Sequence, residues 1–413
     1  MDRLKLRLIM DYIRYGGSVT DEKEKKALLA AISKALKTGQ WQTGPEAKAM
    51  EEEAAKFLGM KYGIVTSSGS CAGLLALEAL ELPKGSEVII SACTFPTIFN
   101  IILQCGLMPV VVDAKIGSYT FDVKEVEKAI TPKTGAIIAI HPVGNPVDMP
   151  ALMKMVAKQK RKIYVLEDNC DGWGGSIGGK KLGSFGDISI TSFHAAHIVS
   201  MGVGGGVFTN DQKLAENVRV YRDWGRLPGA KNPHEAMSGR GGQKLHNFPG
   251  IPKDFDPRFI YTKIGYNFQI LELQAAMGRV QLTKSKKIKA LRKKNFDYLV
   301  KHLSKHKELI MPQSVNGADV CWFSLPLSVQ ARVSRGDLVA HLEKNKIETR
   351  SMFAGDITRH PAYKNAKYRI GSKLTEADFI IRQSFWIPVH PRMTQKDRER
   401  IINAFGTFFK INK

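Results

Sequence analysis

Apolar residues recur at intervals of three and four between residues 21 and 60. The positions concerned are Leu28, Leu29, Ile32, Leu36, Met50, Ala54 and Phe57. Such spacing gathers apolar side chains on one face of a helix. The pattern predicts two helices joined by a turn at Thr38–Gly44.

The pattern changes between residues 62 and 210, where short β-rich runs alternate with helical ones. The predicted strands are Tyr62–Thr66, Glu87–Ser91, Pro109–Asp113, Ala136–His141, Lys162–Glu167, Ile188–Ser192 and Gly206–Thr209. The predicted helices between them are Ala72–Leu82, Pro96–Cys105, Val123–Ile130 and Ala151–Lys158. This alternation predicts an α/β fold with a mostly parallel sheet covered by helices on both faces.

The alternation ends after residue 210. Residues 225–260 are rich in glycine, proline and charge, which predicts a long loop, and long ordered loops are often functional. A helical pattern then runs from about Ile270 to His302, and the remainder indicates a smaller α+β domain. We therefore expect an N-terminal helical segment over 1–60, a large domain over 61–290 and a small domain over 291–413.

Composition narrows the class of protein. With 413 residues, 43% of them hydrophobic, the chain can bury a sizeable core. A net charge of +23 raises nucleic-acid binding as a hypothesis. The basic residues are dispersed, however, and no nucleic-acid module accompanies them, so we expect no specific nucleic-acid partner. An anionic substrate is compatible with the charge.

The cysteines and apolar runs bear on the compartment. Five widely spaced cysteines with no CxxC pair are typical of a reducing, cytoplasmic setting. No apolar run is long enough to span a bilayer, and the first residues lack the apolar region of a signal peptide. We expect a cytoplasmic protein with no membrane partner.

Two segments at strand ends carry candidate chemistry. Thr66–Cys71 places small hydroxyl residues and Gly69 at a helix start, where backbone N–H groups and the helix dipole favour a phosphate. Taken alone, such a segment is more often an ordinary helix cap. Val165–Asp171 places three acidic groups at the end of a buried strand, where open α/β sheets bind ligands. They could hold a protonated ring nitrogen or a metal, or they could form a capped turn.

Two further segments are weaker signals by themselves. His194 and His197 lie three residues apart in a loop that begins at Ser192, without the further ligands that a zinc site needs. The glycine run Met201–Gly206 does not open a helix, so it predicts a tight turn rather than a dinucleotide site. Gly265–Phe268 indicates only a loop before a helix.

Together and in this order, these segments resemble the DegT/DnrJ/EryC1/StrS sugar aminotransferases, a family of fold-type I pyridoxal phosphate enzymes. The resemblance extends from about Gly39 to the C-terminal helix, and several separate motifs carry it. It implies a mostly parallel sheet flanked by helices, a smaller C-terminal α+β domain and a vitamin B6 cofactor.

The resemblance also implies roles for individual residues. The cofactor phosphate would be held by Gly69, Ser70, the Cys71 backbone and Ser192. Phe95 would stack on the cofactor ring, Asp168 would pair with its pyridine nitrogen, and Asp171 would lie near its phenolic oxygen. Asn267 would reach the phosphate of a neighbouring subunit, which implies a homodimer with shared active sites.

One departure from the family pattern concerns the cofactor-binding lysine. The family's aminotransferases carry it five residues after the serine that corresponds to Ser192, and that position is His197 here. No lysine occurs between Lys181 and Lys213. The cofactor should therefore bind non-covalently, as pyridoxal or pyridoxamine phosphate.

This substitution resembles the branch of nucleotide-sugar 3-dehydratases that make 3,6-dideoxy sugars. The segments that agree with the branch are Asn169–Asp171, Arg222–Arg226, Arg350–Gly355 and Thr358–Arg359. The implied substrate is a nucleotide-linked 4-keto-6-deoxy sugar that loses its C3 hydroxyl. His197 would move the proton, since histidine titrates near neutral pH and cannot bind the cofactor covalently in a stable way. Arg350 and Arg359 would meet the diphosphate, although both could equally be surface ion-pair residues.

A second departure concerns electron supply. The branch members that work with a reductase carry a [2Fe–2S] cluster on a cysteine like Cys170 and three more soon after the Arg222–Arg226 motif. Residues 227–320 contain no cysteine here, so we expect no [2Fe–2S] cluster. By analogy with the colitose-type enzymes, L-glutamate would regenerate pyridoxamine phosphate. A plain aminotransferase, which needs the missing lysine, and a non-catalytic cofactor-binding regulator remain the alternatives.

Overall fold

The computed structural model describes residues 12–227, 248–253 and 255–411. Its centre is an eight-stranded sheet in the order β1-β9-β8-β5-β4-β2-β3-β14. The strands are β1 Tyr62–Thr66, β2 Glu87–Ser91, β3 Met108–Val112, β4 Thr134–Ile140, β5 Tyr164–Asp168, β8 Ile188–Ser192, β9 Gly205–Thr209 and β14 Arg369–Ile370. The pairs from β8 through β5, β4, β2 and β3 to β14 are parallel, and β9 is antiparallel to both of its neighbours. The expected mostly parallel sheet is confirmed.

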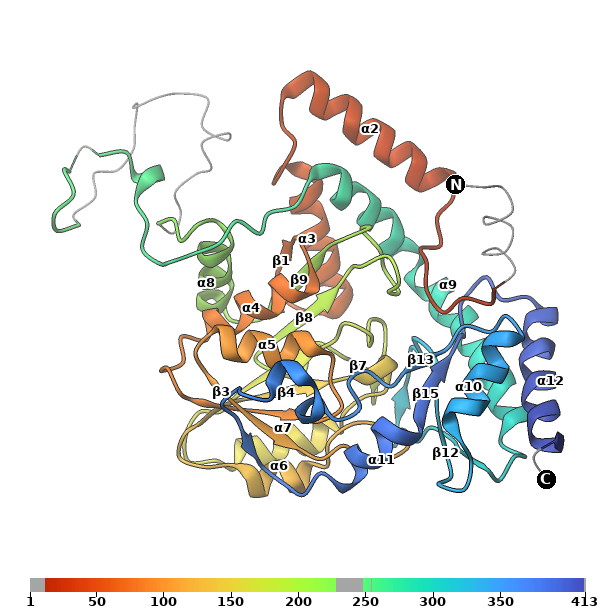
Figure 1. Cartoon of the computed structure of the whole chain (residues 1–413). Coiled ribbons are helices and arrows are strands. Elements are labelled where there is room, and N and C mark those ends of the chain that lie inside the picture. The colour runs from red at the N-terminus through yellow and green to blue at the C-terminus, as the bar shows by residue number, and fades with distance from the viewer. Residues whose placement is uncertain (1–11, 228–247, 254, 412–413) are drawn as a thin grey trace.

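Helices cover both faces of this sheet (Figure 1). They are α3 Pro45–Leu58, α4 Gly69–Ala79, α5 Pro96–Gln104, α6 Val123–Ala129, α7 Met149–Ala157 and α8 Gln212–Arg222. Successive residues of one strand supply different cores: Val88 and Ile90 of β2 pack with α4 and α5, while Ile89 packs with α6 and α7. A strand buried on both faces needs an apolar residue at every position, which explains the continuous apolar runs of the sequence.

A second sheet forms the centre of the C-terminal part. Its order is β10-β12-β15-β13 and all of its pairs are antiparallel. Its strands are β10 Leu309–Ile310, β12 Leu325–Val329, β13 Arg350–Ser351 and β15 Ser384–Ile387, and the helices around it are α10 Arg335–Lys344, α11 Thr375–Gln383 and α12 Gln395–Ile411. A further small sheet joins β6 Ser176–Ile177, β7 Lys180–Lys181 and β11 Ala318–Asp319.

The chain crosses the predicted domain boundaries at three points. The helix α9 Glu272–Leu303 runs past residue 290 from the large domain to the C-terminal part (Figure 1). The strand β14 of the C-terminal part returns to the large sheet, where it pairs with β3. Ile13 pairs with Ile347, so the start of the chain packs on the small domain rather than on the helix α2 Glu22–Thr38 that follows it. The three-part division remains a prediction.

Two sequence expectations concern the long loop and membrane crossing. The predicted loop 225–260 lies largely outside the described residues, because 228–247 and 254 are not described. Across the described ranges, no helix combines the length and the apolar character that crossing a membrane requires.

Candidate active site

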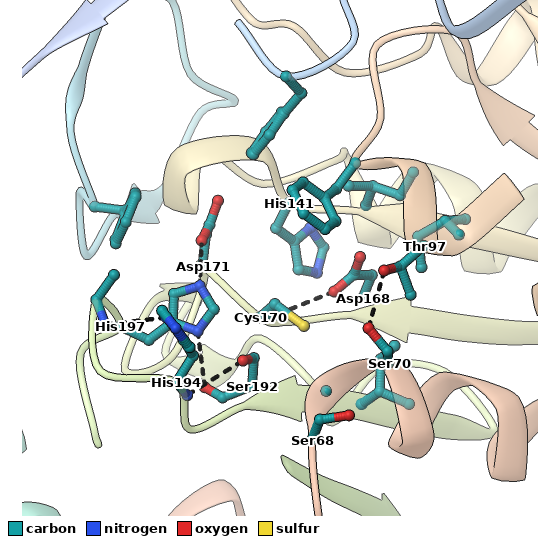
Figure 2. A pocket seen from close by; sticks show the side chains of 18 of the residues that line it. Ser68, Ser70, Thr97, His141, Asp168, Cys170, Asp171, Ser192, His194 and His197 are labelled. Carbon is teal, nitrogen blue, oxygen red and sulfur yellow. Dashed lines mark hydrogen bonds and ion pairs between the residues drawn. The ribbon is translucent and has the colours of Figure 1, made fainter. Parts of the chain in front are cut away.

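A cavity of about 410 Å³ opens at the carboxyl ends of the central strands. Ile140, Asp168 and Ser192 line it, and they are the last residues of β4, β5 and β8. Parallel strands end at the same edge of a sheet, where α/β proteins bind ligands. Figure 2 shows the hydroxyl, carboxyl and imidazole groups that converge there; they belong to Ser68, Ser70, Thr97, His141, Asp168, Asp171, Ser192, His194 and His197.

Asp168 provides a buried negative charge in this cavity. Its side chain is buried, and burial raises the pKa of its carboxyl above the ordinary value. Its Oδ1 accepts a hydrogen bond from the Cys170 backbone N–H at 3.1 Å, and no cationic side chain among the described residues forms an ion pair with it. A buried carboxylate without a cation needs a positive partner. A protonated pyridine nitrogen fits this site.

The start of α4 forms an anion cradle beside Ser192. A Cβ on Gly69 would lie 2.7 Å from the Ser192 Cβ, so only glycine lets the helix start approach β8 this closely. Ser70 Oγ lies 2.9 Å from Thr97 Oγ1, and both side chains line the cavity. Hydroxyl groups at a helix N-terminus suit a phosphate.

The structure changes one detail of the expected cradle. The Cys71 backbone N–H donates to Ser68 Oγ at 3.1 Å, so it closes the helix cap, and Cys71 is not among the cavity-lining residues. Ser68 and Thr97, which the sequence analysis did not single out, line the cavity instead. Ser68 could have been recognised as the helix cap, whereas Thr97 is brought in from α5 by packing.

His197 is held by two contacts. Its Nδ1 lies 3.1 Å from the Ser192 backbone oxygen, and its Nε2 lies 3.3 Å from Asp171 Oδ1. A carbonyl oxygen only accepts, so Nδ1 carries a proton and Nε2 faces the carboxylate. The other Asp171 oxygen accepts the Val143 backbone N–H at 3.0 Å. Val143 has φ +47°, a strained conformation for a β-branched residue, and this conformation directs its N–H toward Asp171.

Glu167, next to Asp168, does not line the cavity but holds a neighbouring loop in place. Its carboxylate accepts backbone N–H groups of Gly183, Phe185 and Gly186, and it lies 3.3 Å from His141 Nε2. Its side chain is fully buried. Of the three acidic residues in this segment, Glu167 therefore fixes the loop after β7, while Asp168 and Asp171 line the cavity. His141 also lines the cavity, and no motif had indicated it.

Two predicted motifs pack on each other away from the cavity. The buried Arg222 lies 2.8 Å from Glu51 and 3.0 Å from Asp223 in ion pairs. The Trp224 backbone N–H donates to the Tyr266 backbone carbonyl oxygen at 2.7 Å, and Asp223 forms an antiparallel backbone bridge with Asn267. The Arg222–Arg226 motif thus supports the segment that carries Asn267.

The remaining predicted residues divide between cavity and surface. Phe95 lines the cavity and is 56% exposed, as a ring available for stacking would be. Asn267 is exposed and does not line this chain's own cavity. Arg350 pairs with Glu348, and Arg359 pairs with Asp356 and Asp378; neither lines the cavity. His194 and Cys170 line it.

Four further aromatic residues complete the cavity, and sequence analysis assigned none of them a role at the site. They are Tyr15, Phe323, Phe353 and Trp386. They come from the start of the chain and from three places in its last hundred residues; Phe353 lies within the Arg350–Gly355 motif, and no motif marks the other three. Only the fold brings them to the strand ends of the large sheet.

The model of the DegT/DnrJ/EryC1/StrS aminotransferase family matches residues 22–406. The chain belongs to this family. It is 36% identical over 412 residues to the lipopolysaccharide biosynthesis protein RfbH of Salmonella typhimurium, with 96% of this chain and 91% of that protein covered. It is 34% identical to the dTDP-4-dehydro-2,6-dideoxy-D-glucose 3-dehydratase of Saccharopolyspora spinosa, with 96% and 86% covered.

A solved structure shares the fold and holds the cofactor. It is a GDP-4-keto-6-deoxymannose-3-dehydratase with a trapped PLP–glutamate geminal diamine, at a TM-score of 0.84 and 26% identity, covering 95% of this chain and 99% of that one. Family, fold and neighbour agree with the cavity's donor set: the cofactor of this protein is pyridoxal phosphate. The chain is thus an enzyme related to sugar 3-dehydratases and aminotransferases.

Proposed function

We propose that this protein is a nucleotide-sugar 3-dehydratase, which removes the C3 hydroxyl of a nucleotide-linked 4-keto-6-deoxyhexose. The observation that carries the proposal is His197, which lines the cavity where the family's aminotransferases have a lysine. No lysine is among the described residues that line the cavity. The site therefore suits a cofactor held without a covalent bond.

The residues of this chain suit that role. The cradle of Ser68, Ser70 and Ser192 would hold the phosphate, and Asp168 would keep the ring nitrogen protonated. Phe95 would stack on the ring. When bound, the cofactor supplies an electron sink that couples loss of a proton beside its ring to departure of hydroxide from the sugar.

His197 would move that proton. Its Nδ1 is bound to the Ser192 carbonyl, so only Nε2 is free to exchange a proton, and Nε2 faces Asp171. The carboxylate would stabilise the imidazolium that forms when Nε2 takes up a proton. Positioned bases of this kind contribute about 10²- to 10⁴-fold to a rate.

Partners follow from the same comparison. The trapped glutamate adduct of the structural neighbour supports L-glutamate as the amino donor that regenerates pyridoxamine phosphate. The absence of a [2Fe–2S] cluster remains a prediction that rests on the lack of cysteines in 227–320. The Arg350 guanidinium lies 4.9 Å from the centroid of the Tyr15 ring, which lines the cavity, and this contact supports the proposed role of Arg350 at the diphosphate. Nothing comparable supports Arg359, whose two ion pairs favour a structural role.

We also propose a homodimer in which Asn267 reaches the partner's cofactor. Asn267 is exposed, and Ile264 beside it is 95% exposed. Phe259 and Tyr261 on the same segment are also exposed, and a group of exposed apolar side chains suits an interface. Light scattering should give a dimer mass, and Ile264→Asp should weaken the dimer and its cofactor affinity together. A wild-type monomer with full activity would contradict this arrangement.

The function is tested by mass spectrometry of the enzyme incubated with pyridoxal phosphate, glutamate and CDP-, GDP- and dTDP-linked 4-keto-6-deoxyhexoses. A 4-keto-3,6-dideoxy product formed without a reductase is the expected result, and it identifies the nucleotide. A 4-amino sugar that keeps its C3 hydroxyl would show a transaminase instead.

A further inference from the structure

Four of the five described Phe, Tyr and Trp residues that line the cavity are linked by ring contacts into a continuous surface, which we call the aromatic wall (Tyr15, Phe323, Phe353 and Trp386). The Phe353 and Trp386 ring centroids lie 5.0 Å apart, and those of Phe323 and Trp386 lie 6.2 Å apart. Tyr15 lies 5.8 Å from Phe323 and 6.3 Å from Trp386. Most of these pairs meet edge to face, a favourable aromatic geometry.

The aromatic wall adjoins the reaction centre at both ends. The Phe323 ring lies 5.5 Å from the His197 ring, and the Phe353 ring lies 6.4 Å from the Phe95 ring. A sugar whose C4 reacts beside His197 must therefore have its neighbouring carbons close to the wall. C6 is two bonds from C4, well within that reach.

Tyr15 is fixed in the wall by the small domain. Its backbone N–H donates to Glu348 Oε2 at 3.0 Å, and the Arg350 guanidinium lies over its ring. Two backbone hydrogen bonds tie Ile13 to Lys346 and Glu348. The first described residues thus hold an aromatic ring over the cavity in a defined place.

Three of the four wall residues present carbon rather than hydrogen-bonding groups to the cavity. Phe323 and Phe353 have no polar side-chain atom, and the Trp386 Nε1 is buried without a partner among the described residues, so it is not offered to the cavity. Tyr15 carries the only hydroxyl of the wall, and the other hydroxyl groups and the carboxyl groups of the cavity come from segments at the strand ends of the central sheet. A methyl group packed on such a surface is stabilised, whereas a hydroxymethyl group there would lose its hydrogen bonds to water.

We propose that the aromatic wall binds the C6 methyl edge of the sugar and selects 6-deoxy over 6-hydroxy 4-keto sugars, with Tyr15 as a specificity-determining residue. This inference rests on the proposed function for the identity of the sugar. Apolar pockets discriminate such pairs by roughly ten- to a hundredfold.

The test is equilibrium binding to the pyridoxal phosphate form without glutamate, so that no turnover occurs. Three ligands with the same nucleotide are compared: the 4-keto-6-deoxy sugar, its 6-hydroxy counterpart and the nucleoside diphosphate alone. We expect wild type to bind the 6-deoxy sugar at least about tenfold more tightly than the 6-hydroxy sugar. Tyr15→Ala should bring that ratio close to one, and Tyr15→Phe should keep it.

Two controls test whether the Tyr15 ring itself causes the selectivity. Tyr12→Ala changes an aromatic residue of the same segment that does not line the cavity, and it should leave the ratio unchanged. If Tyr15→Ala weakens binding of the nucleoside diphosphate as much as binding of both sugars, the Tyr15 ring acts on the nucleotide, directly or through Arg350, and the inference is wrong. Equal affinity of the wild type for the two sugars would also overturn the inference. Failure of the wild type to bind either sugar would overturn it as well.

Binding and catalysis can fail independently. In one case the wild type binds the 6-deoxy sugar selectively and Tyr15→Ala loses that selectivity, while the product keeps its C3 oxygen. That result would refute the dehydration and support the proposed role of the aromatic wall. Dehydration without selectivity would refute the wall alone.

Discussion

The two sides of the cavity are built in different ways. The polar side comes from the large domain, where Asp168 and Ser192 end neighbouring parallel strands and His197 follows five residues after Ser192. The aromatic wall comes from the start of the chain and from separate segments of the small domain. The first arrangement needs only correct strands, because parallel strands end at one edge. The second also needs the start of the chain and the C-terminal sheet to pack against those strand ends.

The largest expected effect is on the polar side. His197→Asn should lower dehydration by about 10²- to 10⁴-fold while the enzyme still binds pyridoxal phosphate, because only proton transfer is lost. Product formation by mass spectrometry and cofactor titration by absorbance check the two parts. Unchanged turnover would remove His197 from the reaction.

The variant His197→Lys tests whether residue 197 faces the cofactor. We expect it to form a covalent bond with the cofactor, seen as a borohydride-stabilised increase in intact mass, and to lose dehydration. A lysine that fails to react would mean that residue 197 does not face the cofactor.

Glu167 and Asp168 offer a matched pair of adjacent acids, one structural and one facing the cavity. Asp168→Asn removes a charged partner, and we expect roughly ten- to a hundredfold weaker cofactor binding, in line with about 1.5–3 kcal/mol for a charged hydrogen bond. Glu167→Gln should instead lower the unfolding temperature, because the carboxylate accepts three backbone N–H groups. Equal effects of both variants on cofactor binding would contradict the division.

The pH dependence of the cofactor-free protein tests Asp168 separately. Burial raises its pKa above 3.8, so the folded state binds the proton more tightly than the unfolded state. The tighter proton binding stabilises the folded state at pH values below the pKa of Asp168 in the unfolded state. This stabilisation is lost as the pH rises through the pKa of Asp168 in the folded state. Asp168→Asn should remove that loss, so the cofactor-free variant should be at least as stable as wild type at neutral pH. Thermal unfolding of both proteins between pH 4 and pH 8 checks this expectation. An Asp168→Asn variant less stable than wild type at neutral pH would contradict it.

Asp171 gives the smallest expected effect among these changes. Asp171→Asn keeps the contact with the Val143 N–H and removes the negative charge beside His197 Nε2. We expect roughly five- to tenfold slower turnover, as about 1 to 1.5 kcal/mol of charge stabilisation would give. Turnover of Asp171→Asn equal to that of the wild type, measured by product mass spectrometry, would remove Asp171 from the reaction.

The sequence determined much of the large domain by itself. The alternation of apolar runs predicted seven strands of the central sheet to within about two residues, because strands buried on both faces leave a continuous apolar signal. The motifs around Gly69, Asp168 and His197 predicted a cofactor cavity, since each lies within a few residues of a strand end. These are local relations between chain position and backbone geometry.

Only the tertiary structure decided the rest. Glu167 and Asp168 are adjacent acids on one strand, and their side chains point to opposite faces, but the alternation alone does not say which face meets the cavity. Tyr15 and Trp386 lie near opposite ends of the chain, yet their rings lie 6.3 Å apart over the reaction centre. Such contacts depend on how the start of the chain and the small domain pack against the strand ends, and apolar residues carry no local mark that distinguishes a cavity wall from a core.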